Sequence, residues 1–381
     1  MKVDYIVKKG KLLDPAIGLN RVADLAVKDG KIAAIGEDLG MEAEHVLNAQ
    51  GMLITAGLID IHAHIYENGV WNGMPADLAA IPMGVTAIAD AGSTGVSNYR
   101  GLLRQCRRNR IRSKIMLNVS ACGIIMPTQF PEPVDPSLWN VALFDEAFQQ
   151  YGDSIIGLKL RINRGVVKEL GLYPLKKAIE LSQRYHTRVI AHVTDAPERM
   201  STVADCMRAG DVFCHVYHGA GHTIMDATGK IEQGILAARE RGVLFDVASG
   251  RGNFSLTIAK QAIEQDFLPD TISSDVTLQN WHNPIAGNLP VVMSRFAALG
   301  MKLEDIVSRV TTEPAKQFGM ADLGTLKVGT CADISIFQLE EKPTYFSDKF
   351  GNRISGNIAF NPMGTMIGGD LLYRNVGLCL I

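Results

Sequence analysis

The sequence predicts an α/β protein: a (β/α)8 barrel, or TIM barrel, with a small β-sandwich domain built from both ends of the chain. Two observations lead to this prediction. Between about residues 56 and 320, short apolar runs alternate with amphipathic helical segments, the pattern of βα units around a parallel sheet. Strand-like runs without such helices occupy both ends of the chain. We therefore expect a barrel at 56–320 and a β domain made of 1–55 and 321–381.

The strands of the small domain are marked by short apolar runs and tight turns. At the N-terminal end they span 2–13, 23–27 and 32–35, and Asp29-Gly30 makes a hairpin turn before the last. At the other end, residues 324–329 lead into a strand at 332–337. The barrel strands are expected at 52–61, 85–89, 115–120, 155–160, 188–191, 212–214, 243–247 and 271–274. Helices are clearest at 175–185, 231–241 and 256–265, and eight such units in roughly 250 residues fit this barrel.

Polar residues mark the ends of several of these strands, where a barrel of this kind carries its chemistry. His62 and His64 end the first strand two residues apart, so their imidazoles point the same way and can clamp a transition metal. The others are Lys159 in the fourth strand, His192 and His215 after the fifth and sixth, and Asp275 after the eighth. Each alone has an ordinary explanation: a polar strand end, a snorkelling or ion-paired lysine, a core histidine or a helix N-cap. Their common position at strand ends favours a single site.

Lys159 needs its own explanation, because an unpaired ammonium is costly inside an apolar strand. A neutral lysine amine can react with CO2 to give a carbamate, whose two oxygens can bridge two cations. We predict two divalent metal ions, zinc being expected although manganese, iron and cobalt also suit such ligands. His62, His64 and Asp275 would hold the first ion, and His192 and His215 the second. His218 and His222 remain alternatives to His215 because they follow it closely.

Composition limits the partners. The chain has 381 residues and a net charge of −2, which argues against nucleic acid and against a membrane surface. The basic run of Arg104, Arg107, Arg108, Arg110, Arg112 and Lys114 is interpreted as a solvated helix face, with a nucleic-acid patch as the alternative. The six cysteines form no C-x-x-C pair and the N-terminus has no signal-peptide pattern, so a cytoplasmic protein with reduced cysteines is expected. The oligomeric state is left open, a homo-oligomer included.

The ordered set of strand-end residues resembles the amidohydrolase superfamily, in its binuclear branch with a carboxylated lysine. Further matches are the opening G-L-I-D-I-H-A-H and the segment K-V-G-T-C-A-D at 327–333. Segments 157–161, 210–215, 242–250 and 272–275 are similar to dihydroorotase-like or adenine-deaminase-like deacetylases, some of which hydrolyse acetyl-(R)-mandelate. The resemblance implies that the six residues are metal ligands and that Asp275 also shuttles the proton. One departure is Ala-Ser-Gly-Arg-Gly at 248–252, where Gly-His-Gly is expected.

The predicted function is a binuclear metal-dependent amidohydrolase or deacetylase, in which a metal-bridging hydroxide attacks an ester or amide carbonyl. Arg161 lies two residues after Lys159, so it should face the barrel mouth and bind a substrate carboxylate, unless it pairs with a neighbouring acid. An O-acetyl 2-hydroxy acid or an N-acyl amino acid would fit. Other expected substrate-binding residues are Tyr66, His218, His222 and Asn253. The alternatives are a cyclic amide hydrolase like dihydroorotase or hydantoinase, a Schiff-base lyase using Lys159, and a non-catalytic scaffold.

Overall fold

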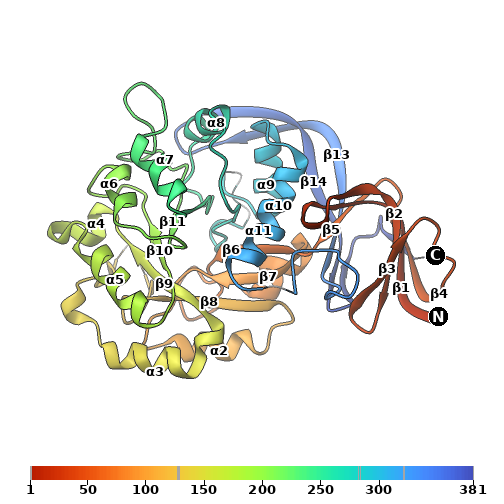
Figure 1. The fold of residues 1–381 in the computed structure, drawn as a ribbon, viewed down its shortest axis with the longest axis horizontal. Helices are drawn as coiled ribbons and strands as arrows, with labels where there is room; N and C mark the ends of the chain where they lie inside the picture. Colours follow the sequence, from red (N-terminus) through yellow and green to blue (C-terminus); the bar gives the residue numbers. More distant parts are fainter. Residues whose placement is uncertain (1, 127–128, 282, 284, 321, 381) are drawn as a thin grey trace.

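A curled sheet of parallel strands surrounded by helices stands beside a second sheet made from both chain ends (Figure 1). This computed structural model describes residues 2–126, 129–281, 283, 285–320 and 322–380. The two sheets have separate apolar cores. The predicted fold, a barrel with a terminal β domain, is confirmed. The predicted domain boundaries stay a prediction, and residues 1, 321 and 381 lie outside the described part.

The barrel sheet has seven parallel strands in the order of the chain. They are β6 (Leu58–Ala63), β7 (Val85–Asp90), β8 (Arg112–Asn118), β9 (Ile155–Arg161), β10 (Val189–His192), β11 (Val212–Cys214) and β12 (Leu244–Asp246). The predicted eighth strand makes only isolated parallel bridges, one to each neighbour. The backbone N–H of Asp275 nevertheless donates to the carbonyl of His62 at 2.8 Å, and that of His64 to Val276 at 2.9 Å. Residues 271–276 therefore close the ring, while the positive φ of 54° at Asp275 interrupts a regular strand.

The first predicted barrel strand was wrong in one respect: it is two strands in different sheets. β5 (Leu53–Ala56) pairs with β1 and β13 of the terminal sheet, and β6 begins two residues later in the barrel. Gly57 lies between them, and its N–H donates to the carbonyl of Asp333 at 2.8 Å. A Cβ atom at Gly57 would stand 2.1 Å from Oγ1 of Thr86 on β7, so only glycine lets the chain pass this close.

The terminal sheet joins strands from the two chain ends in the order β15-β14-β13-β5-β1-β2-β3, with β4 and β16 off this path. Their bounds are β1 (Lys2–Asp14), β2 (Leu19–Lys28), β3 (Lys31–Gly36), β4 (Glu42–Asn48), β13 (Ile334–Ser347), β14 (Arg353–Ile367), β15 (Asp370–Arg374) and β16 (Cys379–Leu380). β13 and β14 form a long hairpin that reaches over the barrel near α8 and α9 (Figure 1). At its tip, buried Asp348 accepts a hydrogen bond from the N–H of Leu256 at 2.8 Å, which ties the hairpin to a barrel helix.

The helices cover the outside of the barrel (Figure 1). Their bounds are α1 (Ala76–Ala80), α2 (Tyr99–Cys106), α3 (Val141–Tyr151), α4 (Arg164–Val167), α5 (Tyr173–Arg184), α6 (Met200–Asp205), α7 (Gln233–Glu240), α8 (Leu256–Glu264), α9 (Leu289–Ala298), α10 (Leu303–Val310) and α11 (Thr312–Gln317). Within the described residues, none of these helices has the length and apolar character needed to span a bilayer.

Two arginines of the basic run, which begins in α2, make ion pairs with distant acids. Arg112 pairs with Asp333 at 3.0 Å and Arg110 with Asp370 at 2.9 Å, and both acids belong to the C-terminal part of the chain. Asp333 is buried, so its charge requires a partner. Both arginines are exposed, as the interpretation of the run as solvated expects, and their ion pairs in addition connect the barrel to the C-terminal part of the chain.

Candidate active site

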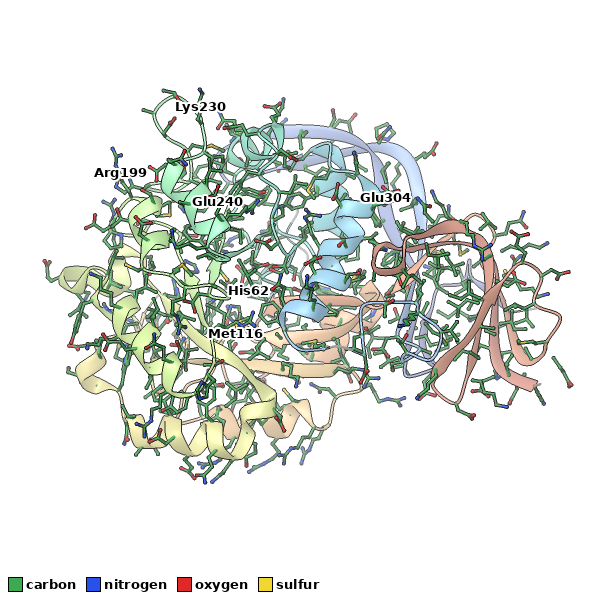
Figure 2. The ribbon with its side chains drawn as sticks, viewed as in Figure 1. His62, Met116, Arg199, Lys230, Glu240 and Glu304 are labelled. Carbon is green, nitrogen blue, oxygen red and sulfur yellow. The ribbon has the colours of Figure 1, made fainter. Side chains whose placement is uncertain are left out.

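A cavity of about 240 Å3 opens at the carboxyl ends of the barrel strands. It brings together all the predicted metal ligands, namely His62, His64, Lys159, His192, His215 and Asp275. Figure 2 shows one of them, His62, within the barrel rather than at its outer surface. Two predicted substrate-binding residues, Arg161 and Asn253, also line this cavity. These residues come from six separate segments of the chain, so the fold brings the cluster together.

His62, His64 and Asp275 form one half of the cluster, and their ligand atoms all lie within 4.8 Å of one another. Oδ1 of Asp275 is 3.7 Å from Nε2 of His62 and 3.4 Å from Nε2 of His64. The other ring nitrogen of His64 contacts the hydroxyl of Ser93 at 2.9 Å. Anchoring one imidazole nitrogen leaves the other free to face a cation, the usual arrangement of metal-binding histidines.

His192 and His215 form the other half, with ring centres 4.3 Å apart. Nδ1 of His215 lies 2.7 Å from the carbonyl oxygen of Ala248, so Nδ1 carries the proton and donates it. Its Nε2 is then a lone-pair acceptor, and it is buried without a hydrogen-bond partner among the described residues. A buried acceptor left unpaired is costly. A bound cation would satisfy it, so the residues present fit a metal ion at this position.

Lys159 lines the same cavity as both halves and is only 3 % exposed. Its Nζ is 3.4 Å from Nε2 of His62 and 3.9 Å from Sγ of Cys214. No carboxylate of the described residues forms an ion pair with it, so the alternative of a lysine paired with an acid finds no support. Gly92 makes room for this side chain, because a Cβ atom there would stand 2.6 Å from Cβ of Lys159. A buried, unpaired amine is consistent with the predicted carbamate.

Burial controls the protonation of the imidazoles. It lowers the pKa of His62, His192 and His215 well below 6.5, because a charged ring is poorly solvated inside the barrel. Neutral imidazole is the form that binds metals. Burial alone would raise the pKa of Asp275, but the neighbouring His64 and His62 outweigh it and hold this pKa below its usual value. At neutral pH the cluster therefore presents neutral imidazoles at His62, His192 and His215 and a carboxylate at Asp275.

Acid should destabilise the metal-free protein. Below pH 6.5 the unfolded chain protonates His62, His192 and His215, whereas the folded protein does not, so stability falls by up to about 1.4 kcal/mol per pH unit for each histidine. We expect the Tm of chelator-treated protein to drop between pH 7.5 and 5.5. His215→Gln should make this dependence shallower, and His222→Gln, at an exposed position, should leave it unchanged. A Tm independent of pH in this window would contradict the assignment.

Cys214 and Asp246 lie next to His62 but do not line the cavity, and the sequence analysis did not predict them as site residues. Nδ1 of His62 lies 3.6 Å from Oδ2 of Asp246 and 3.5 Å from Sγ of Cys214, and these three could also hold a metal by distance. Asp246 already accepts hydrogen bonds from the hydroxyls of Thr271 and Ser273. Burial raises the pKa of the Cys214 thiol, which keeps it protonated. We therefore regard Asp246 as the residue that orients His62. A buried aspartate in the apolar run 243–247 was the available signal.

Arg161 has a partner that the sequence did not identify. Its NH1 donates to Oε1 of Glu132 at 2.8 Å, and the amide of Asn118 donates to the other carboxylate oxygen at 3.3 Å. Glu132 is buried, and Nε of Arg161 has no partner among the described residues. The alternative in which Arg161 pairs with an acid is therefore present, although its guanidinium still lines the cavity.

Three predicted substrate-binding residues lie elsewhere. Tyr66, His218 and His222 are absent from the lining of the cavity that the described residues form. The Tyr66 ring packs against Gly69 and Gly101. His218 is buried with its Nε2 3.4 Å from Sδ of Met200, and His222 is exposed. The geometry thus brings His215 to the cluster rather than the two histidines that follow it.

Known proteins resemble this chain over almost its whole length. Residues 53–372 match the amidohydrolase family. A deacetylase of Enterococcus faecalis is 27% identical over 97% of this chain and 99% of its own length. A deacetylase of Agrobacterium fabrum is 28% identical over 90% of this chain and 85% of its own. Among solved structures, an adenine deaminase matches with a TM-score of 0.90 and 28% identity, covering 98% and 100% of the two chains. A dihydroorotase matches with a TM-score of 0.87 and 25% identity, covering 97% and 98%.

Proposed function

The chain belongs to the amidohydrolase family, and we propose that it is a binuclear metal-dependent deacetylase of a small acylated acid. The family and its deacetylase members indicate a hydrolase acting on ester or C–N bonds, and the resemblance seen in the sequence is confirmed. The proposal that the enzyme depends on metal ions rests on the buried Nε2 of His215, which has no hydrogen-bond partner among the described residues and lies in the same cavity as His62, His64 and Asp275. A cytoplasmic location and a homo-oligomer remain predictions.

We assign the first metal position to His62, His64 and Asp275, the second to His192 and His215, and the bridge between them to a carbamate of Lys159. Two divalent cations held there, zinc in our proposal, would supply an activated water and polarise the scissile carbonyl. Ser93 and Ala248 support this assignment, because they occupy the Nδ1 atoms of His64 and His215, so that the Nε2 of His64 faces Asp275 and that of His215 has no partner among the described residues.

Asp275 is placed to move the proton. Its Oδ1 faces His62 and His64, while Oδ2 accepts a hydrogen bond from the amide of Asn253 at 3.2 Å. A Cβ atom at Gly250 would stand 2.3 Å from Oδ2, so this loop lies directly over the carboxylate. In the proposed reaction Asp275 accepts the proton of the attacking water and delivers it to the leaving oxygen or nitrogen. Asn253 fixes its orientation.

The proposed substrate carries a carboxylate near the scissile bond. Glu132 accepts a hydrogen bond from one nitrogen of Arg161, and the Arg161 side chain still lines the cavity. Arg251 lines the same cavity and forms no ion pair within the described part of the chain. Glu132 offsets Arg161, and Asp275 faces His62 and His64, so the guanidinium of Arg251 is left without a carboxylate partner among the described residues. This favours an anion such as an O-acetyl 2-hydroxy acid or an N-acyl amino acid.

Arg161→Met should raise KM for an anionic substrate by about 10- to 100-fold, because a charge-assisted hydrogen bond contributes roughly 1.5–3 kcal/mol. A neutral ester of the same acyl group should be spared. Arg161→Lys, which retains the charge opposite buried Glu132, is the control for damage to that pair. Steady-state kinetics on both substrates, with metal content measured, decide the outcome. Equal losses on both substrates with metals retained would make Arg161 structural.

A cyclic amide hydrolase is the second candidate, because a dihydroorotase structure matches the chain with a TM-score of 0.87. A Schiff-base lyase would use Lys159 but would leave the unpaired nitrogen of His215 unexplained. The deciding experiment is a hydrolysis screen of O-acyl hydroxy acids, N-acyl amino acids and cyclic amides, with enzyme supplied with divalent metal and bicarbonate. Turnover of cyclic amides alone would replace the deacetylase proposal, and turnover undiminished by chelation would exclude the metal-dependent mechanism.

A further inference from the structure

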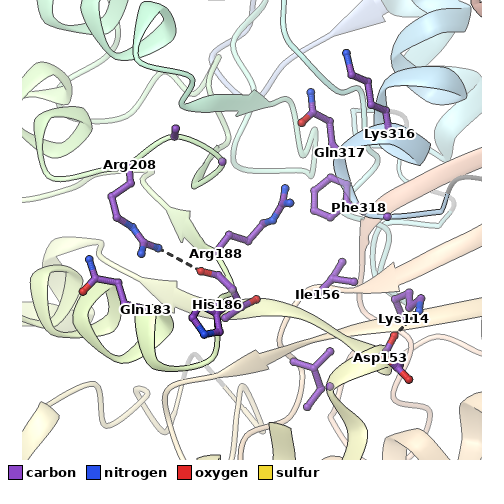
Figure 3. Close-up of a pocket in the computed structure, with 16 residues that line it drawn as sticks. Lys114, Asp153, Ile156, Gln183, His186, Arg188, Arg208, Lys316, Gln317 and Phe318 are labelled. Carbon is purple, nitrogen blue, oxygen red and sulfur yellow. Dashed lines mark hydrogen bonds between the residues drawn. The ribbon is translucent and has the colours of Figure 1, made fainter.

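A second, larger cavity lies at the opposite end of the barrel and plays no part in the proposed reaction. Its volume is about 1020 Å3, and it is lined by residues that precede β9, β10 and β11 and by those that end α11 (Figure 3). Arg188 immediately precedes β10, whereas His192 is the last residue of that strand. At about 3.3 Å per residue, the two residues are separated by roughly 13 Å. A ligand here would therefore not block the active site.

Arg188 is the distinctive side chain of this cavity. It extends across the cavity toward Phe318, and its guanidinium carbon lies 4.9 Å from the centre of that ring (Figure 3). Its NH1 is buried and has no hydrogen-bond partner in the part of the chain that the structure describes. Nor does any described carboxylate form an ion pair with it. Burial lowers the pKa of Arg188, but a guanidinium stays charged at neutral pH. The cavity thus contains a partly buried cation that has no ion-pair partner among the described residues; the acid that attracts it, Asp211, is already paired with Arg208.

The other charged groups do not neutralise Arg188. Arg208 is already paired with buried Asp211 at 2.8 Å, and Lys114 donates to the backbone carbonyl of Asp153 (Figure 3). Lys316 lies at the rim on an exposed, flexible stem. Asp153 is the only carboxylate among the described lining residues, against four arginines and lysines. The field in the cavity is therefore positive.

We propose that this cavity is a second binding site, for a small anion with phosphate or carboxylate oxygens, anchored by Arg188 and assisted by Lys316. The planar fork of a guanidinium matches both kinds of oxyanion, and a bound oxyanion would give the unpaired NH1 its partner. The aromatic ring of Phe318 holds the guanidinium from one side, so the fork is positioned before the anion arrives. The volume leaves room for an organic group attached to the anion.

Inorganic phosphate and sulfate are suitable probes, titrated against metal-loaded protein at constant ionic strength maintained with chloride. A ligand that binds the folded state raises Tm with a saturable dependence on its concentration. We expect such a rise for the wild-type protein, a loss of at least tenfold in apparent affinity for Arg188→Met, and a smaller loss for Lys316→Met. A stronger effect of citrate than of phosphate on this same site would identify carboxylates as the preferred source of the oxyanion.

The matched control is Arg184→Met, which removes the same charge from the neighbouring helix α5, where Arg184 pairs with Asp145. It should leave the phosphate effect unchanged. Arg188→Lys keeps the charge but not the planar fork, so it should bind phosphate more weakly than wild type and more tightly than Arg188→Met. If Arg188→Met does not fold, Arg188→Lys takes its place in the test. Turnover should be unaffected in all three. A Tm rise that survives Arg188→Met would place phosphate elsewhere, the metal centre included, and overturn the proposal.

Discussion

Lys159→Ala should lose both metal ions and lower kcat by about 10³-fold or more, because water activation and carbonyl polarisation depend on the same pair of cations. Lys159 lines the same cavity as both groups of histidines, and no described carboxylate offers an alternative bridge. Metal analysis of the purified variant and its steady-state kinetics check the expectation. Intact-mass analysis of the wild type should show the added mass of one CO2. A fully metallated wild-type protein with an unmodified lysine would contradict the proposed carbamate.

Two further measurements separate this role from a structural one. Acetate or propionate added to Lys159→Ala should partly restore metal content and activity, because a small carboxylate can occupy the vacated space and bridge the cations. Cys214→Ala is the matched control, since Cys214 lies 3.9 Å from the amine and 3.5 Å from His62 but outside the cavity lining. It should retain the metals. Loss of metal in Cys214→Ala as complete as in Lys159→Ala would instead favour the His62–Cys214–Asp246 group as the metal site.

The strand-end residues could be predicted because the carboxyl ends of parallel barrel strands converge by geometry. His62, Lys159 and Asp275 stood out as polar residues within or after apolar runs, so the sequence alone placed them at one end of the barrel. The same criterion would have identified Asp246, which lies within the seventh apolar run.

Loop partners could not be predicted in this way. Glu132 lies in a segment without regular structure, and no periodicity connects it to Arg161 on β9, 29 residues later. The sequence also did not show that the apolar run 52–61 forms two strands in different sheets, because this depends on the tertiary contact between Gly57 and Thr86. Arg110 and Arg112 illustrate the same limit, since their partners are more than two hundred residues away. The local pattern of apolar residues predicts which segments form strands and helices. Contacts between distant segments determine where those elements end and which side chains pair.

Asp275→Asn should keep the fold and the metals but reduce kcat by about 10²–10⁴-fold, the usual contribution of a general acid–base group. Asparagine adopts the positive φ of 54° found here as readily as aspartate, and its amide oxygen can still face His62 and His64. The amide cannot accept the proton of the attacking water. Asp275 is the only carboxylate among the described residues that line the cavity, so no neighbour can replace it.

The matched control for this variant is Asp195→Asn, which changes an acid that follows β10 and pairs with Arg164 outside the cavity lining. Its kcat should remain within about twofold of wild type, since exposed ion pairs contribute little. Asn253→Ala, which removes only the hydrogen bond to Oδ2 of Asp275, should give an intermediate loss. Far-UV CD and metal analysis accompany each kinetic measurement. A near-normal kcat in metallated Asp275→Asn would assign the proton transfer to another group, because a carboxamide at this position has no basic site to receive a proton.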